Sequence, residues 1–130
     1  MSRSLLSLLL CALALPHALG AHDPIAAVDG LLVRLLGAPA RALFQLETVA
    51  ADLATGLDVF ELGSNGSLVV LRGNCGSSLA AALNVYLKYE LNASVTWGRN
   101  ASGVQVRLPP VLPLPAPTRT VMPAQRRYAW

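Results

Sequence analysis

The stretch RGNCGSS, residues 72–78, is the part of the sequence whose residue types could do chemistry. It stands between an apolar run at residues 68–71 and a helical-looking stretch at residues 79–91. A glycine turn that leads into a helix N-terminus favours the thiolate form of a cysteine, so Cys75 could be reactive. A cysteine nucleophile also needs a histidine base, and both histidines stand within the first 22 residues. Cys75 is therefore interpreted as a structural residue.

The same glycines are compatible with an anion-binding loop, because backbone N–H groups at the start of a helix attract phosphate. The stretch lacks the lysine of a GxxxxGK[ST] phosphate loop and does not fit GxGxxG. The simpler interpretation is a structural turn, in which Gly73 and Gly76 adopt positive φ angles for a sharp reversal. Ser77 or Ser78 would then cap the helix that follows.

Seven carboxylates are scattered along the chain without a paired motif. A glycosidase needs two carboxyl groups held across one bond, and nothing in the spacing indicates such a pair. Metal sites draw on clusters of histidine and cysteine, which this composition lacks. The sequence therefore predicts no catalytic residue, no cofactor-binding residue and no metal ligand. The carboxylates are Asp23, Asp29, Glu47, Asp52, Asp58, Glu61 and Glu90.

The N-terminus has the pattern of a secretory signal peptide over residues 1–20. Arg3 precedes an apolar stretch at residues 5–15, and small residues stand at positions −3 and −1 of a cleavage site. The apolar stretch is shorter than the roughly 20 residues that a membrane span needs, so no membrane anchor is predicted. Cleavage would also remove Cys11, which leaves one cysteine and excludes an intrachain disulfide. We expect the chain to enter the secretory pathway.

Three Asn-X-Ser sequons lie in or beside expected turns, at Asn65, Asn92 and Asn100. Surface turns of a protein in the secretory pathway can carry N-linked glycans on such asparagines. One sequon alone would be weak, because sequons also arise by chance. Three sequons in expected turns, in a chain with a signal peptide, predict that at least one of these asparagines carries a glycan.

The net charge of +3 at pH 7 comes from the two ends of the chain. Between residues 21 and 118, six basic residues stand against seven carboxylates. This part of the chain therefore has no basic excess with which to bind a phosphate backbone, and a nucleic-acid partner is not expected.

The hydrophobic pattern of residues 21–108 predicts one small α+β domain. Apolar residues recur at helical spacing in two segments, and shorter segments with β-forming residues are separated by turn residues. The order of these segments favours two layers, with two helices packed on a mostly antiparallel sheet. The expected elements are a helix from Asp23 to Gly37, a strand at 43–49, a hairpin with its turn at Gly63 to Gly66, a helix at 79–91, and a closing hairpin at 93–108.

The sequence from residue 109 onward is rich in proline, and six of the nine prolines fall within residues 109–123. Such a composition predicts a semi-rigid, extended connector. An SH3-type ligand is the alternative, which suits a secreted protein poorly. We therefore interpret residues 109–130 as a proline-rich linker followed by the truncated start of a missing domain.

Four segments in order resemble the N-terminal domain of the lysosomal α-N-acetylglucosaminidases, exo-glycosidases of heparan sulfate breakdown. No single motif is specific, but the ordered set covers the chain from the first helix to about Pro115. The segments are VDGLLVRLLG at 28–37, LDVFELG at 57–63, VVLRGNCGSSLAAALNVYLKYEL at 69–91 and VTWGRNASGVQVRLPPVLPLP at 95–115.

The resemblance implies a non-catalytic accessory domain that precedes a (β/α)₈ barrel, and RRYAW at residues 126–130 looks like the start of that barrel. In the family the barrel carries both catalytic carboxylates, so no catalytic residue carries over and this chain alone is expected to be inactive. The implied partner is the barrel of the same polypeptide, with heparan sulfate reached only through the whole enzyme, and the implied location is the lysosome. The alternative function is a stand-alone secreted glycoprotein that binds a partner.

Overall fold

The computed structural model describes residues 23–95 and 104–123, and of residues 94, 95, 104 and 105 it describes the backbone alone. Three sequence-based predictions fall outside these residues. They are the signal peptide at 1–20, the sequon at Asn100, and the likeness of residues 126–130 to the start of a barrel.

Two helices open the described chain, α1 (Pro24–Leu36) and the short α2 (Ala38–Arg41). The predicted N-cap is confirmed, because the backbone N–H of Ile25 donates to Asp23 Oδ1 over 2.9 Å. The predicted stop is also confirmed: α1 ends before Gly37, which has φ +88°. Helix α2 was not predicted, and an ion pair between Arg41 and Asp29 of α1 holds it in place.

The four-stranded sheet consists of β1 (Phe44–Thr48), β3 (Leu68–Gly73), β2 (Val59–Asn65) and β6 (Thr118–Val121), in that spatial order. Two of its three strand pairs are antiparallel, as the sequence predicts, whereas β1 and β3 are parallel. A short two-stranded sheet of β4 (Ser94–Val95) and β5 (Val104–Gln105) stands apart from it. The alternation of apolar and polar residues within one strand does not indicate which other strand it pairs with. For this reason the parallel pair was not predicted.

The hairpin of β2 and β3 is confirmed, but its predicted turn at Gly63 to Gly66 is wrong by two residues. Strand β2 continues to Asn65, and Asn65 lies opposite Leu68, so the loop is Gly66-Ser67. Gly66 has φ +59°, which suits a tight two-residue turn. Gly63 instead extends the ladder opposite Val70.

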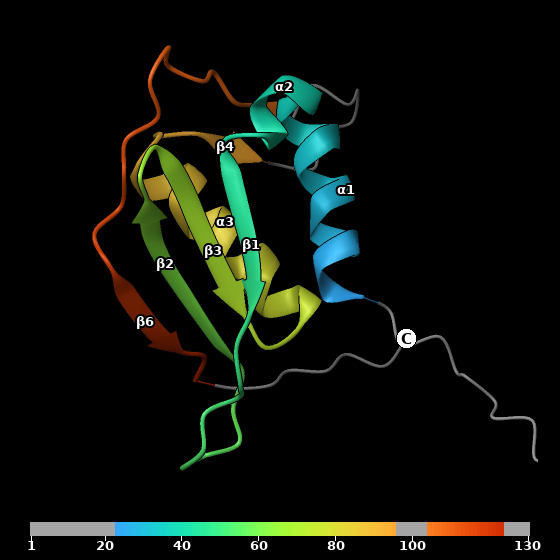
Figure 1. Cartoon of the computed structure of the whole chain (residues 1–130), viewed down its shortest axis with the longest axis vertical. Helices are drawn as coiled ribbons and strands as arrows, with labels where there is room; N and C mark the ends of the chain where they lie inside the picture. Colours follow the sequence, from blue (N-terminus) through green and yellow to red (C-terminus); the bar gives the residue numbers. More distant parts are fainter. Residues whose placement is uncertain (1–22, 96–103, 124–130) are drawn as a thin grey trace, which may run out of the picture.

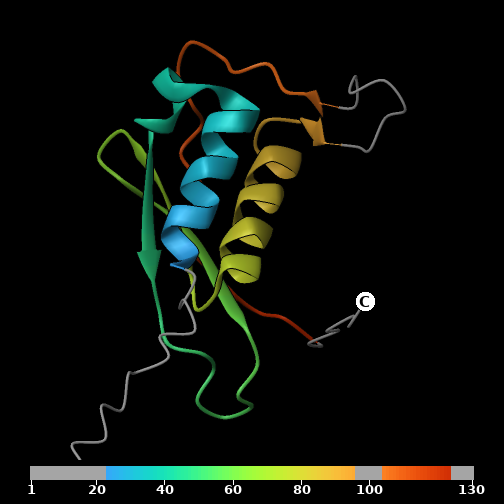
Figure 2. The same cartoon turned by 90° about the vertical axis from the view of Figure 1, so that its right-hand side faces the viewer.

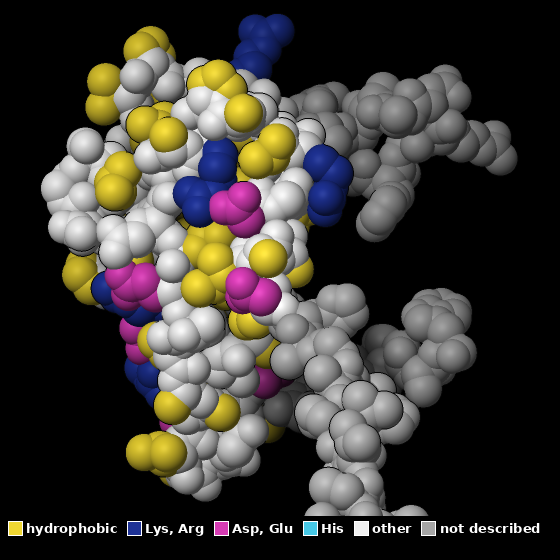
Figure 3. Space-filling model, turned by 45° about the vertical axis from the view of Figure 1, so that its right-hand side comes forward, with side chains coloured by type: hydrophobic (Ala, Val, Ile, Leu, Met, Phe, Trp, Pro, Cys, Tyr) yellow, Lys and Arg dark blue, Asp and Glu magenta, His cyan; other side chains and the backbone are white. Residues whose placement is uncertain are grey.

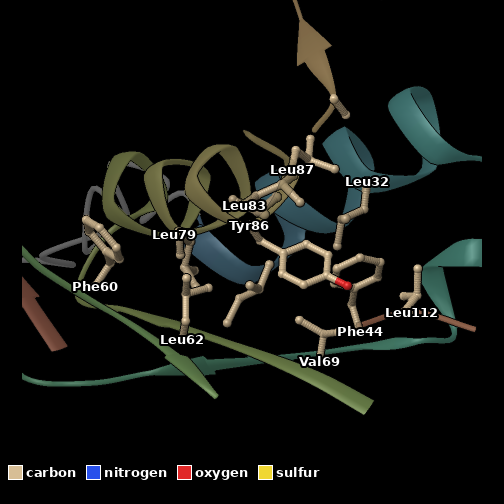
Figure 4. Close-up of a cluster of buried hydrophobic side chains, with 14 residues drawn as sticks. Leu32, Phe44, Phe60, Leu62, Val69, Leu79, Leu83, Tyr86, Leu87 and Leu112 are labelled. Carbon is tan, nitrogen blue, oxygen red and sulfur yellow. The ribbon is translucent and has the colours of Figure 1, made fainter. Parts of the chain in front are cut away.

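The molecule has the predicted two layers. Helices α1 and α3 (Gly76–Tyr89) lie side by side on one face of the large sheet, as Figures 1 and 2 show. Side chains from both helices and from the sheet fill the space between the layers (Figure 4). The buried cluster comprises Val28, Leu32, Phe44, Phe60, Leu62, Val69, Leu71, Leu79, Ala82, Leu83, Tyr86, Leu87, Ala93 and Leu112.

Tyr86 lies at the centre of this core and is fully buried. Its ring meets the ring of Phe44 edge-on, with centroids 5.6 Å apart and an interplanar angle of 86°. Its hydroxyl donates to the carbonyl oxygen of Pro113 over 2.9 Å. Burial, and secondarily the charge of Glu90, raises the pKa of Tyr86 to about 12. The side chain therefore joins helix, sheet and proline-rich segment in one place.

The proline-rich segment is extended, as the sequence predicts, but the structure packs it onto the domain. Leu112 is buried in the core, and residues 118–121 form the edge strand β6 against β2. Proline lacks the N–H that a sheet interior requires, so the residues between Pro117 and Pro123 are the part of the segment that can pair. Packing of the domain thus continues beyond residue 108.

Replacing Tyr86 with phenylalanine tests this junction. The substitution keeps the ring and removes the bond to Pro113, so we expect the free energy of unfolding to fall by about 1 kcal/mol. Hydrogen exchange should become faster in residues 112–121. Tyr89→Phe is the control, because Tyr89 is 67% exposed and should leave both measurements unchanged. Unaltered exchange in the Tyr86→Phe variant would contradict the anchoring role.

Candidate functional site

The corner between β3 and α3, residues 72–78, is the region that the sequence singles out for chemistry. Strand β3 ends at Gly73 and α3 begins at Gly76, so only two residues separate them. The helix starts earlier than predicted, and Cys75 is the N-cap. Ser78, one of the two predicted capping residues, accepts the backbone N–H of Cys75 over 3.0 Å and donates to its carbonyl over 2.8 Å. Its fully buried hydroxyl thereby closes the first turn of the helix.

The predicted reason for the two corner glycines is wrong. In the described chain positive φ angles occur at Gly37, Gly56, Gly66 and Asn92, and therefore at neither Gly73 nor Gly76. Gly73 is instead required by a close approach: a Cβ there would lie 2.5 Å from Ser78 Oγ and 2.7 Å from the backbone nitrogen of Leu79. At Gly76 a Cβ would meet only Pro24, at 3.9 Å.

The remaining polar groups of the corner are also used by the fold. Asn74 accepts the backbone N–H of Val59 at its Oδ1 over 2.8 Å and donates from Nδ2 to Asp58 over 2.8 Å. These bonds tie the corner to the start of β2. No histidine lies in residues 23–95 or 104–123, so the described part of the chain offers Cys75 no imidazole base. The corner therefore has a structural role, which is to connect strand β3 to helix α3.

Acidic and basic side chains alternate in a row across the sheet, which sequence reasoning missed. In the strand register Glu47 lies opposite Arg72, Arg72 opposite Glu61, and Glu61 opposite Arg119. Glu61 stands between the core residues Phe60 and Leu62, so the row lies on the face away from the helices. A sequence signal for it was the partial alternation along β1, which puts Glu47 on the face opposite to Phe44 and Leu46.

In this row two carboxylates share a sheet face on either side of an arginine. Their strands are two spacings apart, about 10 Å, which is beyond the about 5–5.5 Å of a retaining glycosidase and at the upper limit of the about 6.5–9.5 Å of an inverting one. Glu47 forms an ion pair with Arg72, and Glu61 binds Arg119 over 2.7 Å. Both carboxylates are thereby engaged in holding strands together. On the face that Figure 3 shows, the basic side chains are dispersed, and some of them stand beside acidic ones.

The loop between β1 and β2 presents an unusual apolar residue. Asp52 Oδ2 accepts from the backbone N–H of Thr55 over 3.0 Å and from its hydroxyl over 2.7 Å. These bonds, with the nearby Arg119 guanidinium, hold the pKa of Asp52 below its usual value. The turn that they stabilise carries Leu53 with 96% of its surface exposed.

Three further features bear on the class of protein. Within the described residues, no three histidine, cysteine, aspartate or glutamate side chains gather as a metal site would require. None of the helices in that part of the chain has the length and apolar character that a membrane crossing demands. Of the predicted glycan acceptors, Asn65 and Asn92 are both exposed.

The fold and the engagement of its polar groups define a small α+β domain of the accessory kind. The family described as "Alpha-N-acetylglucosaminidase (NAGLU) N-terminal domain" matches residues 26–114. The chain belongs to this family, which confirms the resemblance seen in the sequence. No curated protein matches the chain significantly.

Solved structures with the same fold are family 89 glycoside hydrolases from Clostridium perfringens. A complex with 2-acetamido-1,2-dideoxynojirmycin has a TM-score of 0.72 and 28% identity, and the match covers 81% of this chain and 12% of that one. A complex with PUGNAc gives 0.70 and 28%, over 82% and 12%. A doubly substituted CpGH89 bound to its substrate GlcNAc-alpha-1,4-galactose gives 0.70 and 28%, over 81% and 12%. This chain thus spans about an eighth of the length of those enzymes.

The two corner glycines make a matched test. Gly73→Ala forces a Cβ against backbone, so we expect it to lower the free energy of unfolding by about 1–3 kcal/mol or more. Gly76→Ala adds a methyl group in ordinary contact distance at the start of a helix, so stability should hold or rise by up to about 1 kcal/mol. Urea unfolding of both variants measures the difference. Equal effects would refute the close-approach explanation.

Proposed function

We propose that this chain is the non-catalytic N-terminal domain of an exo-α-N-acetylglucosaminidase that removes terminal N-acetylglucosamine from heparan sulfate. The observation that carries the proposal is the family match over residues 26–114, together with a fold that spans only 12% of family 89 enzymes. Hydrolysis then belongs to the remainder of such an enzyme. The role of this domain is to pack on the catalytic barrel of the same polypeptide and support its folding.

The use of the carboxylates supports the absence of catalysis in this domain. Six of the seven acidic residues take part in a cap, a turn, a corner or an ion pair. A carboxylate that is committed to a structural partner is not free to protonate a leaving group or attack a sugar. These residues are Asp23, Asp29, Glu47, Asp52, Asp58 and Glu61.

The end of the domain that carries the β1–β2 loop is the docking surface we propose for the catalytic barrel. The backbone N–H of Met122 donates to the Asp58 carbonyl over 2.8 Å, so the chain leaves β6 beside this loop. Figure 1 places the loop and the end of β6 at the same end of the molecule. Leu53 is presented there on a turn that is already ordered, so its burial against a partner costs little conformational entropy.

Heparan sulfate is a polyanion, and this domain offers it little. The charge row across the sheet alternates in sign, and the arginines of that row are bound to carboxylates. Contact with substrate therefore falls to the rest of the enzyme. The predicted signal peptide supports a route through the secretory pathway. The proposed breakdown of heparan sulfate, which the family carries out in the lysosome, implies a lysosomal location.

A stand-alone secreted glycoprotein that binds a partner is the second candidate. The observation in its favour is a core in which fourteen residues are buried. An open reading frame downstream of residue 130 that encodes aromatic-rich barrel sequence would exclude it. Its persistence as a short protein in tissue would support it.

Activity and size measured together test the proposed function. An antibody against residues 23–123 should detect, in native extract, a polypeptide of full enzyme size that hydrolyses an α-N-acetylglucosaminide. The purified 130-residue chain should show no hydrolysis above background. A reactive band only near the size of the short chain, without activity, would favour the stand-alone protein. Hydrolysis by the 130-residue chain itself would overturn the non-catalytic assignment.

Leu53→Ser tests the proposed docking surface. In the 130-residue chain the substitution should change the free energy of unfolding by no more than about 0.5 kcal/mol, because the side chain is exposed. In the longer polypeptide it should cost about 1.5–3 kcal/mol, since a buried leucine is lost there. Val111→Ser is the control, at a residue 81% exposed in the proline-rich segment, and should be neutral in both. Equal behaviour of the two variants in the longer polypeptide would place the interface elsewhere.

A further inference from the structure

We propose that Asn65 is an N-glycan acceptor and that the β2–β3 hairpin is the glycan-bearing end of the domain. The sequon Asn65-Gly66-Ser67 occupies the end of β2 and both residues of the hairpin loop. All three residues are exposed. A bulky, soluble oligosaccharide at this position meets no neighbouring layer of the fold.

The side-chain geometry of Asn65 is compatible with a glycan. Its Nδ2 donates one hydrogen bond, to Gln45 Oε1 over 3.1 Å, on the exposed sheet face. An amide nitrogen carries two hydrogens, and glycosylation replaces one of them. One hydrogen therefore remains on Nδ2 after the modification and is available for a bond to Gln45.

The chemical step balances with a co-reactant of the secretory pathway, an oligosaccharide carried on a polyisoprenoid diphosphate. The amide nitrogen Nδ2 forms a bond to C1 of the first sugar. The bond between C1 and the diphosphate oxygen breaks, and the lipid diphosphate leaves. The amide gives up one proton. No oxidant or reductant takes part, and the protein contributes only the exposed acceptor.

Asn65 and Asn92 differ in whether the backbone conformation explains an asparagine at that position. Asn92 has φ +49° and follows the end of α3, where the left-handed conformation favours glycine or asparagine. The backbone alone therefore explains an asparagine at residue 92. Asn65 lies in a strand without a positive φ, and its side chain donates to Gln45 on the exposed face of the sheet. The structure thus singles out Asn65 among the two described sequons.

The position of Asn65 in the molecule also suits a glycan. Figures 1 and 2 show the β2–β3 hairpin at the end opposite to the β1–β2 loop and the end of β6. A glycan on the hairpin leaves the end with Leu53 open. The inference does not rest on the proposed function, and it requires only that the chain enters the secretory pathway, as its N-terminus predicts.

Peptide mapping of the 130-residue chain expressed in a mammalian secretory cell line tests the site. Peptide N-glycosidase converts a glycosylated asparagine to aspartate, so residue 65 should be read as aspartate after treatment and as a glycopeptide before it. Asn65→Gln and Ser67→Ala should each remove one glycosidase-sensitive step in electrophoretic mobility. Two variants that act at different residues of one sequon separate the modification from an effect on folding.

Asn84→Gln is the matched control, because Asn84 is exposed on α3 and is followed by Val85-Tyr86, which makes no sequon. It should retain every glycosidase-sensitive step. Circular dichroism should give the same melting temperature for this variant and for the deglycosylated Asn65→Gln variant. An unmodified asparagine at residue 65 in the expressed chain overturns the proposal, whether or not Asn92 or Asn100 carries a glycan.

Discussion

The close approach of β3 to α3 at Gly73 is the constraint on which the rest of the structure depends. Because Gly73 has no side chain, Ser78 Oγ and the backbone of Leu79 come within 3 Å of where its Cβ would stand. The helix can then turn back directly over the strand that precedes it. This fold-back sets α3 on the central strand of the sheet, and α1 packs beside it. Gly73 is required because it has no side chain, which allows the close contact. Its φ angle is one that other residues can also adopt.

Once α3 is placed, Tyr86 extends the same layer to the proline-rich segment. Its buried hydroxyl needs a partner, and the Pro113 carbonyl supplies one. That bond, with Leu112 in the core, directs the segment along the sheet to where β6 can pair with β2. The ion pairs of the charge row then join β1 to β3 and β2 to β6 on the opposite face. Core and edge are therefore joined through one tyrosine.

The proposed function of the domain is supported by how its polar groups are used. Three polar residues of the β3–α3 corner are candidates for chemistry in the sequence, yet in the structure they cap α3 and hold the start of β2. They are Cys75, Ser78 and Asn74. Carboxylates that could serve a glycosidase hold turns and strands. Two exposed residues lie at opposite ends of the domain: Leu53 beside the end of β6, and Asn65 on the hairpin. Such a distribution suits a domain that supports a larger enzyme.

The sequence by itself determined the two long helices, the β2–β3 hairpin, the two-layer class and the family, because apolar periodicity, an N-cap and the order of segments are local properties of the chain. It placed Gly73 at a critical corner but assigned the wrong cause, since a contact with Ser78 Oγ is invisible until strand and helix are folded together. Tertiary structure alone decided the parallel pairing of β1 with β3, the charge row and the capture of residues 118–121 as a strand. Each of these depends on which distant segments meet, and that choice is made by burial of the shared core around Tyr86 and not by the residues of any one segment.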